Sequence, residues 1–109
     1  MTRDEIMKLK VGRETDYLIA EKVLGIDPYT SGFRGLYSWV KNYSNDIAAA
    51  WILVERLEFT IVHTETGYLV GRLSESAHLH GGPWFPDGFA EAPTAPLAIC
   101  RAALLAVMP

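Results

Sequence analysis

The stretch FTIVHTETGYLVGRL, Phe59 to Leu73, carries the pattern that decides the fold. Two segments rich in Ile, Val, Thr and Tyr flank the turn Thr64-Glu65-Thr66-Gly67, and this arrangement is typical of a β-hairpin. A short third strand is expected from Gly88 to Glu91. The sequence therefore predicts a small antiparallel sheet.

Helical patterns precede this hairpin from the start of the chain. Thr2 and Glu5 have capping-box spacing, which predicts a short helix over residues 3–10. Helical spacing resumes after Gly12 and is expected to end at Gly25. The apolar stripe of this second segment consists of Tyr17, Ala20, Val23 and Leu24.

Two longer helices are predicted, one before the strands in the sequence and one after them. The first runs from Ser44, a good N-cap, to Glu58, and the second covers 94–107 with Thr94 as its cap. In the first helix we expect Ala48 to Ala50 to allow close approach to the sheet or to a neighbouring subunit. Trp51 is expected to anchor the core. The expected apolar faces are Ile47, Ala50, Trp51, Val54 and Leu57 in the first helix, and Leu97, Cys100, Ala103, Leu104 and Val107 in the second.

These elements define an α+β fold, a three-layer α/β/α sandwich with a small antiparallel sheet in the order α-α-β-β-β-α. The two loop regions, 26–42 and 74–92, are rich in turn residues, and the first could hold a short strand near 36–40. All 109 residues are expected to form one domain.

Composition and charge exclude several classes of protein. Half of the residues are hydrophobic and 21% are charged, so a disordered chain is not expected. The net charge of −3 argues against a protein that neutralises phosphates on duplex nucleic acid. The sequence shows no membrane-spanning run and no signal-peptide core, and its single cysteine, Cys100, suits a reducing cytoplasm.

Three blocks, in this order, resemble the small bacteriophage proteins of the phage ABA sandwich domain family: GRETDYLIAEKVLG (12–25), YSNDIAAAWILVERL (43–57) and TAPLAICRAALLAV (94–107). The resemblance covers most of the chain and implies a three-layer sandwich encoded by a phage or prophage. The host bacterial cytoplasm is then the expected location. The chain is also similar, more weakly, to the phage sponge proteins of the sequestin type, which sequester nucleotide immune signals made by bacterial TIR-domain defences.

The sequence predicts neither a metal site nor an enzyme, and no cofactor is expected. His63, His78 and His80 lack the further ligands that a metal site needs. Cys100 lies on an apolar stripe, where thiols are usually inert. Neither a nucleophile elbow nor a phosphate-binding glycine loop is present.

Aromatic side chains and helix starts favour ligand binding over catalysis. Aromatic faces can stack nucleobases, and a capped helix start such as Ser44 offers backbone N–H groups to phosphate. Asp46 would instead hold a ribose hydroxyl. The residues alone favour the alternative, in which the aromatic residues cover a small core and the caps only stabilise helix ends. The family resemblance described above brings the two interpretations closer. The aromatic residues in or directly next to the two loop regions are Tyr29, Phe33, Tyr37, Trp39 and Tyr43, followed by Trp84, Phe85 and Phe89.

Arg101 and Arg13 are the cations of greatest interest. Arg101 shares a helix side with Ala98, Ala102 and Leu105, so it must reach solvent, an acidic partner or an anion. Pairing with Glu21 and contact with a phosphate both remain open, and Arg13 has the same two interpretations. The predicted ligand-binding residues are Arg13, Trp39, Tyr43, Ser44, Asp46, Trp84, Phe85 and Arg101.

The leading hypothesis is a phage accessory protein that binds and sequesters a nucleotide-derived signal of the cyclic ADP-ribose type, countering TIR-based defence. The alternative is a protein-interaction module without catalysis. A double-stranded-RNA-binding domain is a third interpretation, which the acidic balance opposes. The nearly all-apolar last helix makes a homodimer plausible, with a ligand pocket at its seam.

Overall fold

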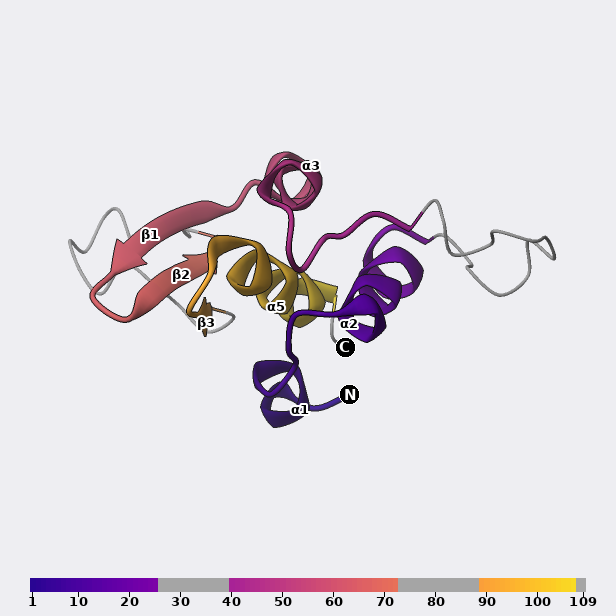
Figure 1. Ribbon diagram of the computed structural model, residues 1–109, viewed down its shortest axis with the longest axis horizontal. Helices are drawn as coiled ribbons and strands as arrows, with labels where there is room; N and C mark the ends of the chain where they lie inside the picture. Colours follow the sequence, from indigo (N-terminus) through magenta and orange to yellow (C-terminus); the bar gives the residue numbers. More distant parts are fainter. Residues whose placement is uncertain (26–39, 73–88, 108–109) are drawn as a thin grey trace, which may run out of the picture.

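The computed structural model describes residues 1–25, 40–72 and 89–107 (Figure 1). A helical N-terminal half precedes three strands and a last helix, which confirms the predicted α+β class with a small antiparallel sheet. The elements are α1 (Arg3–Met7), α2 (Arg13–Leu18), the π-helical turn η1 (Ile19–Val23), α3 (Ile47–Leu57), β1 (Thr60–Thr64), β2 (Gly67–Gly71), β3 (Ala90–Ala92) and α5 (Ala95–Val107).

The sheet has the antiparallel order β1-β2-β3, and its first two strands are the predicted hairpin. Ile61 pairs with Val70 in the hairpin, and Val70 pairs in turn with Ala90 of β3. The third strand ends at Ala92, one residue later than expected, because Ala92 still pairs with Tyr68 of β2. The register places Val70, which is fully buried, at the centre of the sheet.

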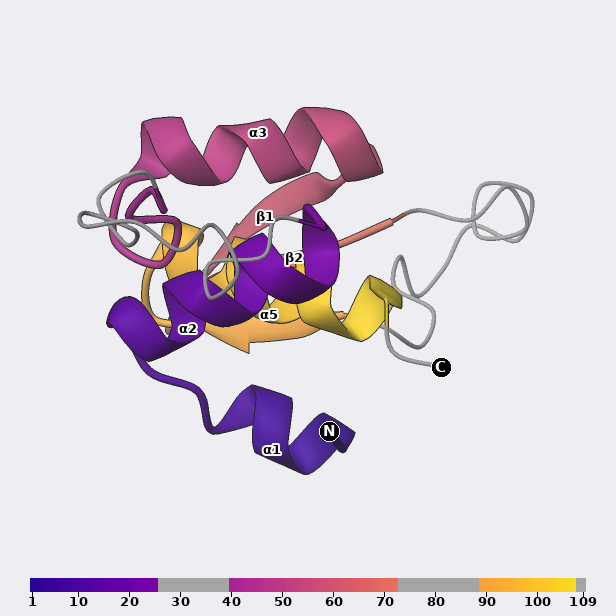
Figure 2. The same ribbon diagram turned by 90° about the vertical axis from the view of Figure 1, so that its right-hand side faces the viewer.

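Helix α5 is the central element of the molecule and is buried on nearly all sides. It contacts β2, β3, α3, η1 and α1. In Figure 2, α2 lies in front of α5 and the sheet lies behind it, so α5 lies between the second helix and the sheet. The stripe predicted from Leu97 to Leu104 is buried, but Val107 is 40% exposed. Ala98, Ala102 and Leu105 on the other side are buried too, so α5 has no free apolar face for a second subunit.

The N-terminal helices largely follow the sequence. The capping box between Thr2 and Glu5 is present, although α1 ends at Met7. Helix α2 begins directly after Gly12 and continues as η1, in which the N–H of Leu24 donates to the carbonyl of Ile19. Gly25 has a φ of +70°, a left-handed conformation that ends the helix as expected.

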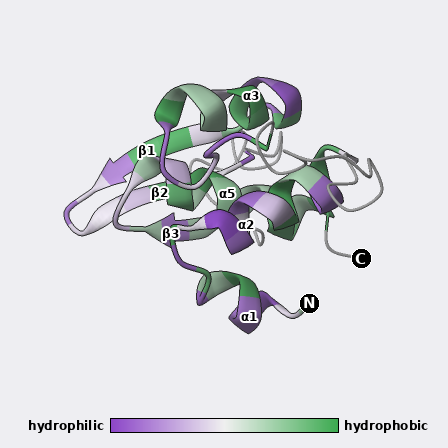
Figure 3. Cartoon of the chain, turned by 45° about the vertical axis from the view of Figure 1, so that its right-hand side comes forward, coloured by the Kyte–Doolittle hydropathy of each residue, from purple (hydrophilic) through white to green (hydrophobic). Residues whose placement is uncertain are grey.

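Helix α3 differs from the prediction in both its start and its orientation. Its N-cap is Asp46, whose carboxylate accepts the N–H of Ala48 at 2.9 Å, and not Ser44. Trp51 is 46% exposed, so its predicted role as a core anchor is wrong. Figure 3 shows hydrophobic residues on both α3 and α5. The residues of α3 that are buried are Ala49, Ala50, Leu53 and Val54.

The alanine turn explains this orientation. Because alanine is the smallest side chain after glycine, the turn with Ala49 and Ala50 can lie close to α5, where an indole ring would not fit. Ala49 and Ala50 are buried, and α3 packs against α5, so the structure gives the neighbour of this helix as α5 where the sheet or a second subunit was predicted. Ala48 remains exposed.

Candidate ligand site beside helix α3

A buried polar network joins the start of α2 to the turn that precedes α3. The Ser44 hydroxyl donates to Oδ1 of Asp16 at 2.7 Å, and the Ser44 N–H donates to the same oxygen at 2.8 Å. The N–H of Gly12 donates to the Ser44 hydroxyl at 3.0 Å. Asp16 is 2% exposed and Ser44 is fully buried. Ser44 therefore connects the turn before α3 to the start of α2. The prediction that Ser44 caps α3 is wrong.

Arg13 lies at the edge of this network and contacts Asn42 in the segment before α3. Its Nη1 donates to Oδ1 of Asn42 at 2.8 Å and forms an ion pair with Asp16 at 3.3 Å. The guanidinium carbon lies 5.2 Å from the centroid of the Tyr17 ring, within the range of a cation–π contact. The side chain is 41% exposed, so the cation is also accessible to solvent.

Tyr43 lies between these polar residues in sequence but belongs to the core. It is 3% exposed, and the pKa of its phenol is raised by burial and, to a smaller extent, by the nearby Asp16 carboxylate. A ring in this position cannot present its face to a ligand in solution. The structure thus favours a packing role for Tyr43.

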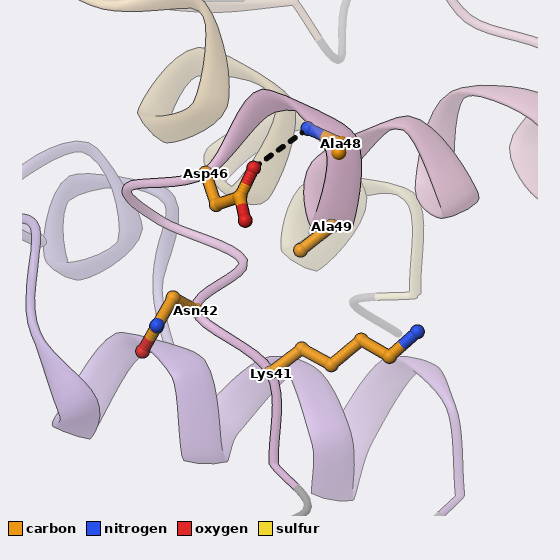
Figure 4. Close-up of a pocket in the computed structure, with 5 residues that line it drawn as sticks. All are labelled: Lys41, Asn42, Asp46, Ala48 and Ala49. Carbon is orange, nitrogen blue, oxygen red and sulfur yellow. Dashed lines mark hydrogen bonds between the residues drawn. The ribbon is translucent and has the colours of Figure 1, made fainter.

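A cavity of about 310 Å³ lies beside the first turn of α3 (Figure 4). Lys41 and Asn42 form one side of it, and Asp46, Ala48 and Ala49 form the other. Figure 4 shows that one Asp46 carboxylate oxygen accepts the hydrogen bond from the Ala48 N–H. The other oxygen lies on the side of the cavity. The hydrogen bond from Arg13 to Asn42 places a second cation next to this cavity.

Arg101 lies elsewhere and is held by main-chain carbonyls. Its Nε and Nη2 donate to the Leu9 oxygen at 3.2 and 2.6 Å, and its Nη1 donates to the Glu91 oxygen at 2.7 Å. Burial lowers the pKa of its guanidinium. Glu21, the predicted ion-pair partner of Arg101, is exposed on η1. The observed partners of Arg101 are these two carbonyl oxygens. Arg101 therefore fastens the end of the α1 segment to the sheet.

Arg101 also lines a second cavity of about 300 Å³, which it shares with Met7, Thr66, Glu91, Ala92 and Pro93. Arg13 is not among these lining residues. The structure thus brings Arg13, Tyr43, Ser44 and Asp46 together around the segment 41–46 but separates Arg101 from them. Trp39, Trp84 and Phe85 lie outside the described residues, as do Tyr29, Phe33, Tyr37, His78 and His80.

Asp16, Lys41 and Asn42 were missed by the sequence analysis. Asp16 had a recognisable signal, because it precedes Ile19 and Ala20 by three and four residues and so shares their buried helix face. Lys41 and Asn42 had none, since their position depends on contacts with α2 and α3.

The described residues contain no group of three or more potential metal ligands. His63 is exposed, with its ring 4.9 Å from the ring of Tyr68 on the paired strand. Cys100 is fully buried, as expected, and burial strongly raises the pKa of its thiol. Within the described ranges, no helix combines the length and the apolar character needed to cross a bilayer.

The structure thus defines a small α+β domain with a polar cavity beside one helix. The model of the phage ABA sandwich domain family matches residues 17–104, and the chain belongs to this family. It is accordingly a phage accessory protein, in agreement with the resemblance of the three sequence blocks. No curated protein and no solved structure matches the chain. The weaker similarity to sponge proteins stays a prediction.

Proposed function

We propose that this phage protein binds a nucleotide-derived signal of the cyclic ADP-ribose type in the cavity beside α3 and withholds it in the host cytoplasm. The observation that carries the proposal is the set of polar groups around about 310 Å³ of space, namely Lys41, Asn42 and Asp46, with Arg13 behind Asn42. This volume is at the lower end of the range for small-molecule sites.

The lining residues suit the parts of such a ligand. The Lys41 ammonium supplies a flexible positive charge for a diphosphate, and Arg13 adds a second cation at 2.8 Å from the Asn42 amide oxygen. The cavity-facing oxygen of Asp46 can accept a hydrogen bond from a ribose hydroxyl. The prediction from sequence that Trp39, Trp84 and Phe85 stack on the base concerns residues outside the described part of the chain.

Binding without turnover is part of the same proposal. The described residues around the cavity are an ammonium, an amide, a carboxylate and two alanine methyl groups. They offer charge and hydrogen bonds but no nucleophile paired with a base, which covalent catalysis generally needs. The ligand should therefore leave the protein chemically intact.

Calorimetry with cyclic ADP-ribose and ADP-ribose tests the proposal. Lys41→Ala should weaken binding about 10-fold, because a charge-assisted contact with phosphate is lost at an exposed site. Lys22→Ala is the matched control, since Lys22 is exposed on η1 and does not line the cavity. Chromatography of ligand released by heating should recover it unchanged. No heat of binding, or a degraded ligand, rejects sequestration.

A second candidate function, a protein-interaction module, is supported by the exposed side of α3. Ile47, Trp51 and Ile52 are 47%, 46% and 36% exposed, and tryptophan is enriched among the residues that dominate protein interfaces. A pull-down from phage-infected host lysate should then recover a stoichiometric partner. The partner should be lost with Trp51→Glu and retained with Val62→Glu on β1.

A further inference from the structure

We infer that helix α1 blocks the outer edge of strand β3, and that a second copy of this chain pairs its own β3 with this edge when α1 is displaced. β3 is the last strand in the order β1-β2-β3, and no other strand of the described residues pairs with its outer side. The edge of a sheet is a ready template for pairing with another chain. In Figures 1 and 3, α1 lies below β3, on the side away from β2.

Two arginines occupy the outward carbonyls of this edge. Nη2 of Arg3, on α1, donates to the Phe89 oxygen at 2.9 Å, and Nη1 of Arg101, on α5, donates to the Glu91 oxygen at 2.7 Å. Because main-chain groups alternate in direction along a strand, two residues that are two positions apart point to the same edge. The acceptors that an added strand needs are therefore already in use.

The N-terminal segment is fastened at both of its ends. Arg3 is the first residue of α1, and at the other end the Leu9 oxygen accepts Nε and Nη2 of Arg101. Between these points the buried residue of α1 is Ile6, which is 1% exposed. One buried side chain and two guanidinium groups thus hold the segment, so a change at few positions should displace it.

Helix α1 covers the edge without packing tightly on it. A cavity of about 300 Å³ lies between Met7 of α1 and the residues Glu91, Ala92 and Pro93, and Arg101 also lines it. The hydrogen bonds from the arginines therefore protect the edge more than side-chain packing does. Once they are lost, the backbone of β3 becomes accessible to another strand.

A twofold axis between two copies of Ala90 gives the register of the added pair. Each Glu91 N–H, which faces the same edge as its carbonyl, then donates to the Phe89 oxygen of the partner subunit. This oxygen is the acceptor that Arg3 occupies in the single chain. The register also places Glu91 opposite Phe89 of the partner subunit, so that like charges are not directly opposed. The edge is therefore complementary to itself, as a twofold interface requires.

A detached variant tests the inference in the full chain. Arg3→Ala combined with Ile6→Asp removes both the donor to Phe89 and the buried anchor of α1. β3 has only 3 residues, so the association should be weak, and sedimentation velocity from about 1 to 500 µM covers the expected range. The detached variant should associate at least about 10-fold more strongly than the wild type, because its edge is open.

Glu91→Pro separates strand pairing from association through the apolar surface beneath α1. Proline lacks the N–H that the added pair requires, and an edge strand tolerates it where the N–H faces outward. In the detached variant this third change should weaken association about 10-fold or more, since both inter-strand bonds from residue 91 are lost. The apolar surface is the same in both proteins, so association by that surface would persist.

Arg3→Ala alone keeps Ile6 and provides a milder variant if the detached variant does not fold. It should strengthen association about 3-fold, through partial opening of the edge. Arg56→Ala is its matched control, because Arg56 is an exposed arginine in the last turn of α3. Circular dichroism of each variant checks that the protein is folded.

Amide hydrogen exchange measures the pairing at the edge directly. The Glu91 amide should exchange quickly in the wild type, since it faces away from β2, and should be protected at least about 10-fold more in the associated variant. An open edge that does not strengthen association in any folded variant overturns the inference. Association that Glu91→Pro leaves unchanged overturns it too, and so does a Glu91 amide that stays unprotected in the associated state.

Discussion

The hydroxyl of Ser44 and the carboxylate of Asp16 lie 2.7 Å apart in a buried site, although 28 positions separate them in the sequence. Asp16 also accepts the Ser44 N–H and pairs with Arg13. A buried carboxylate is costly unless such partners compensate for lost hydration. This contact therefore fixes the turn before α3 against α2, and the cavity beside α3 depends on it.

Ser44→Asp distinguishes this role from that of a helix cap. Aspartate caps helices as well as serine does, so a cap at this position would tolerate the change. In the observed site the new carboxylate would be buried next to Asp16, and we expect a loss of about 3 kcal/mol or more, or failure to fold. Urea unfolding measures the loss.

Ser44→Ala is the milder companion variant and should cost about 1–3 kcal/mol, because a buried carboxylate loses one donor. Thr66→Ala is the control, since the Thr66 hydroxyl donates to Glu91 at an exposed site, and surface changes usually stay within about 0.5 kcal/mol. Wild-type stability in Ser44→Asp would contradict the buried role.

Local patterns predicted those parts of the fold that local contacts form. The hairpin, the capping box at Thr2, the end of the second helix at Gly25 and the extent of α5 all follow from neighbouring residues. Each involves hydrogen bonds or φ preferences within a few positions of the chain. These features are confirmed in the structure.

The orientation of α3 and the role of Ser44 could not be predicted in the same way. Helix α3 is apolar on several sides, since Ile47, Ile52 and Leu53 point to three different sides of its axis. Periodicity then does not select the buried side, and the contact with α5 decides it. Ser44 fits a cap motif by sequence, but its partner Asp16 belongs to another helix. Long-range contacts prevailed over local preference at both positions.

Arg101→Ala should reduce stability and leave ligand affinity unchanged. The guanidinium joins the carbonyls of Leu9 and Glu91 through three hydrogen bonds. Their loss removes the donors to the partly buried Leu9 oxygen as well as one exposed hydrogen bond, and we expect the free energy of unfolding to fall by about 2–3 kcal/mol. Thermal melting and calorimetry on the same variant measure both quantities. A large fall in affinity with an unchanged melting temperature would return Arg101 to the ligand site.

Gly67→Ala should be far more damaging than Gly25→Ala. Gly67 has a φ of +155°, and a Cβ there would overlap the carbonyl oxygen of Ala92 and approach Pro93. These are backbone atoms at the end of β3 and of the residue after it, so the contact between β2 and β3 must shift. Gly25 has a φ of +70° with open space around it.

The two glycine variants therefore separate a steric clash from simple backbone strain. Gly25→Ala should cost about 1 kcal/mol from its positive φ. Gly67→Ala should cost at least about 2 kcal/mol more than that, because clash and strain add. Equal midpoints in denaturant would contradict the close approach of β2 and β3.

Leu53→Ala and Trp51→Ala test the orientation of α3. Leu53 is fully buried, and its truncation should cost about 2–5 kcal/mol through lost packing and a cavity. Trp51 is 46% exposed, and its replacement should cost less than about 1 kcal/mol in the monomer. Denaturation at low protein concentration avoids any contribution from association. The reverse ranking would mean that Trp51, and not Leu53, faces α5.

Cys100 gives the fold a dependence on alkaline pH. Burial raises the pKa of its thiol far above the ordinary value of 9.0, and the Asp16 carboxylate adds to the shift. The unfolded chain releases the thiol proton above pH 9, whereas the folded chain retains it. The stability linked to this group is therefore fully present below pH 9 and is lost as pH rises toward the folded pKa.

Comparison of the wild type with Cys100→Ala isolates this effect. The difference in unfolding free energy should be constant between pH 7 and 8 and then fall by about 1.4 kcal/mol between pH 8 and 10, as one proton becomes linked to unfolding. Tyr43 shares the direction of the pKa shift, but it is present in both proteins and cancels in the difference. Native Cys100 should also resist thiol reagents until denaturant is added, since a buried thiol is both protonated and inaccessible. A difference that stays flat to pH 10, or rapid labelling of the native protein, would show that the thiol is accessible to solvent and that α5 is not enclosed at this position.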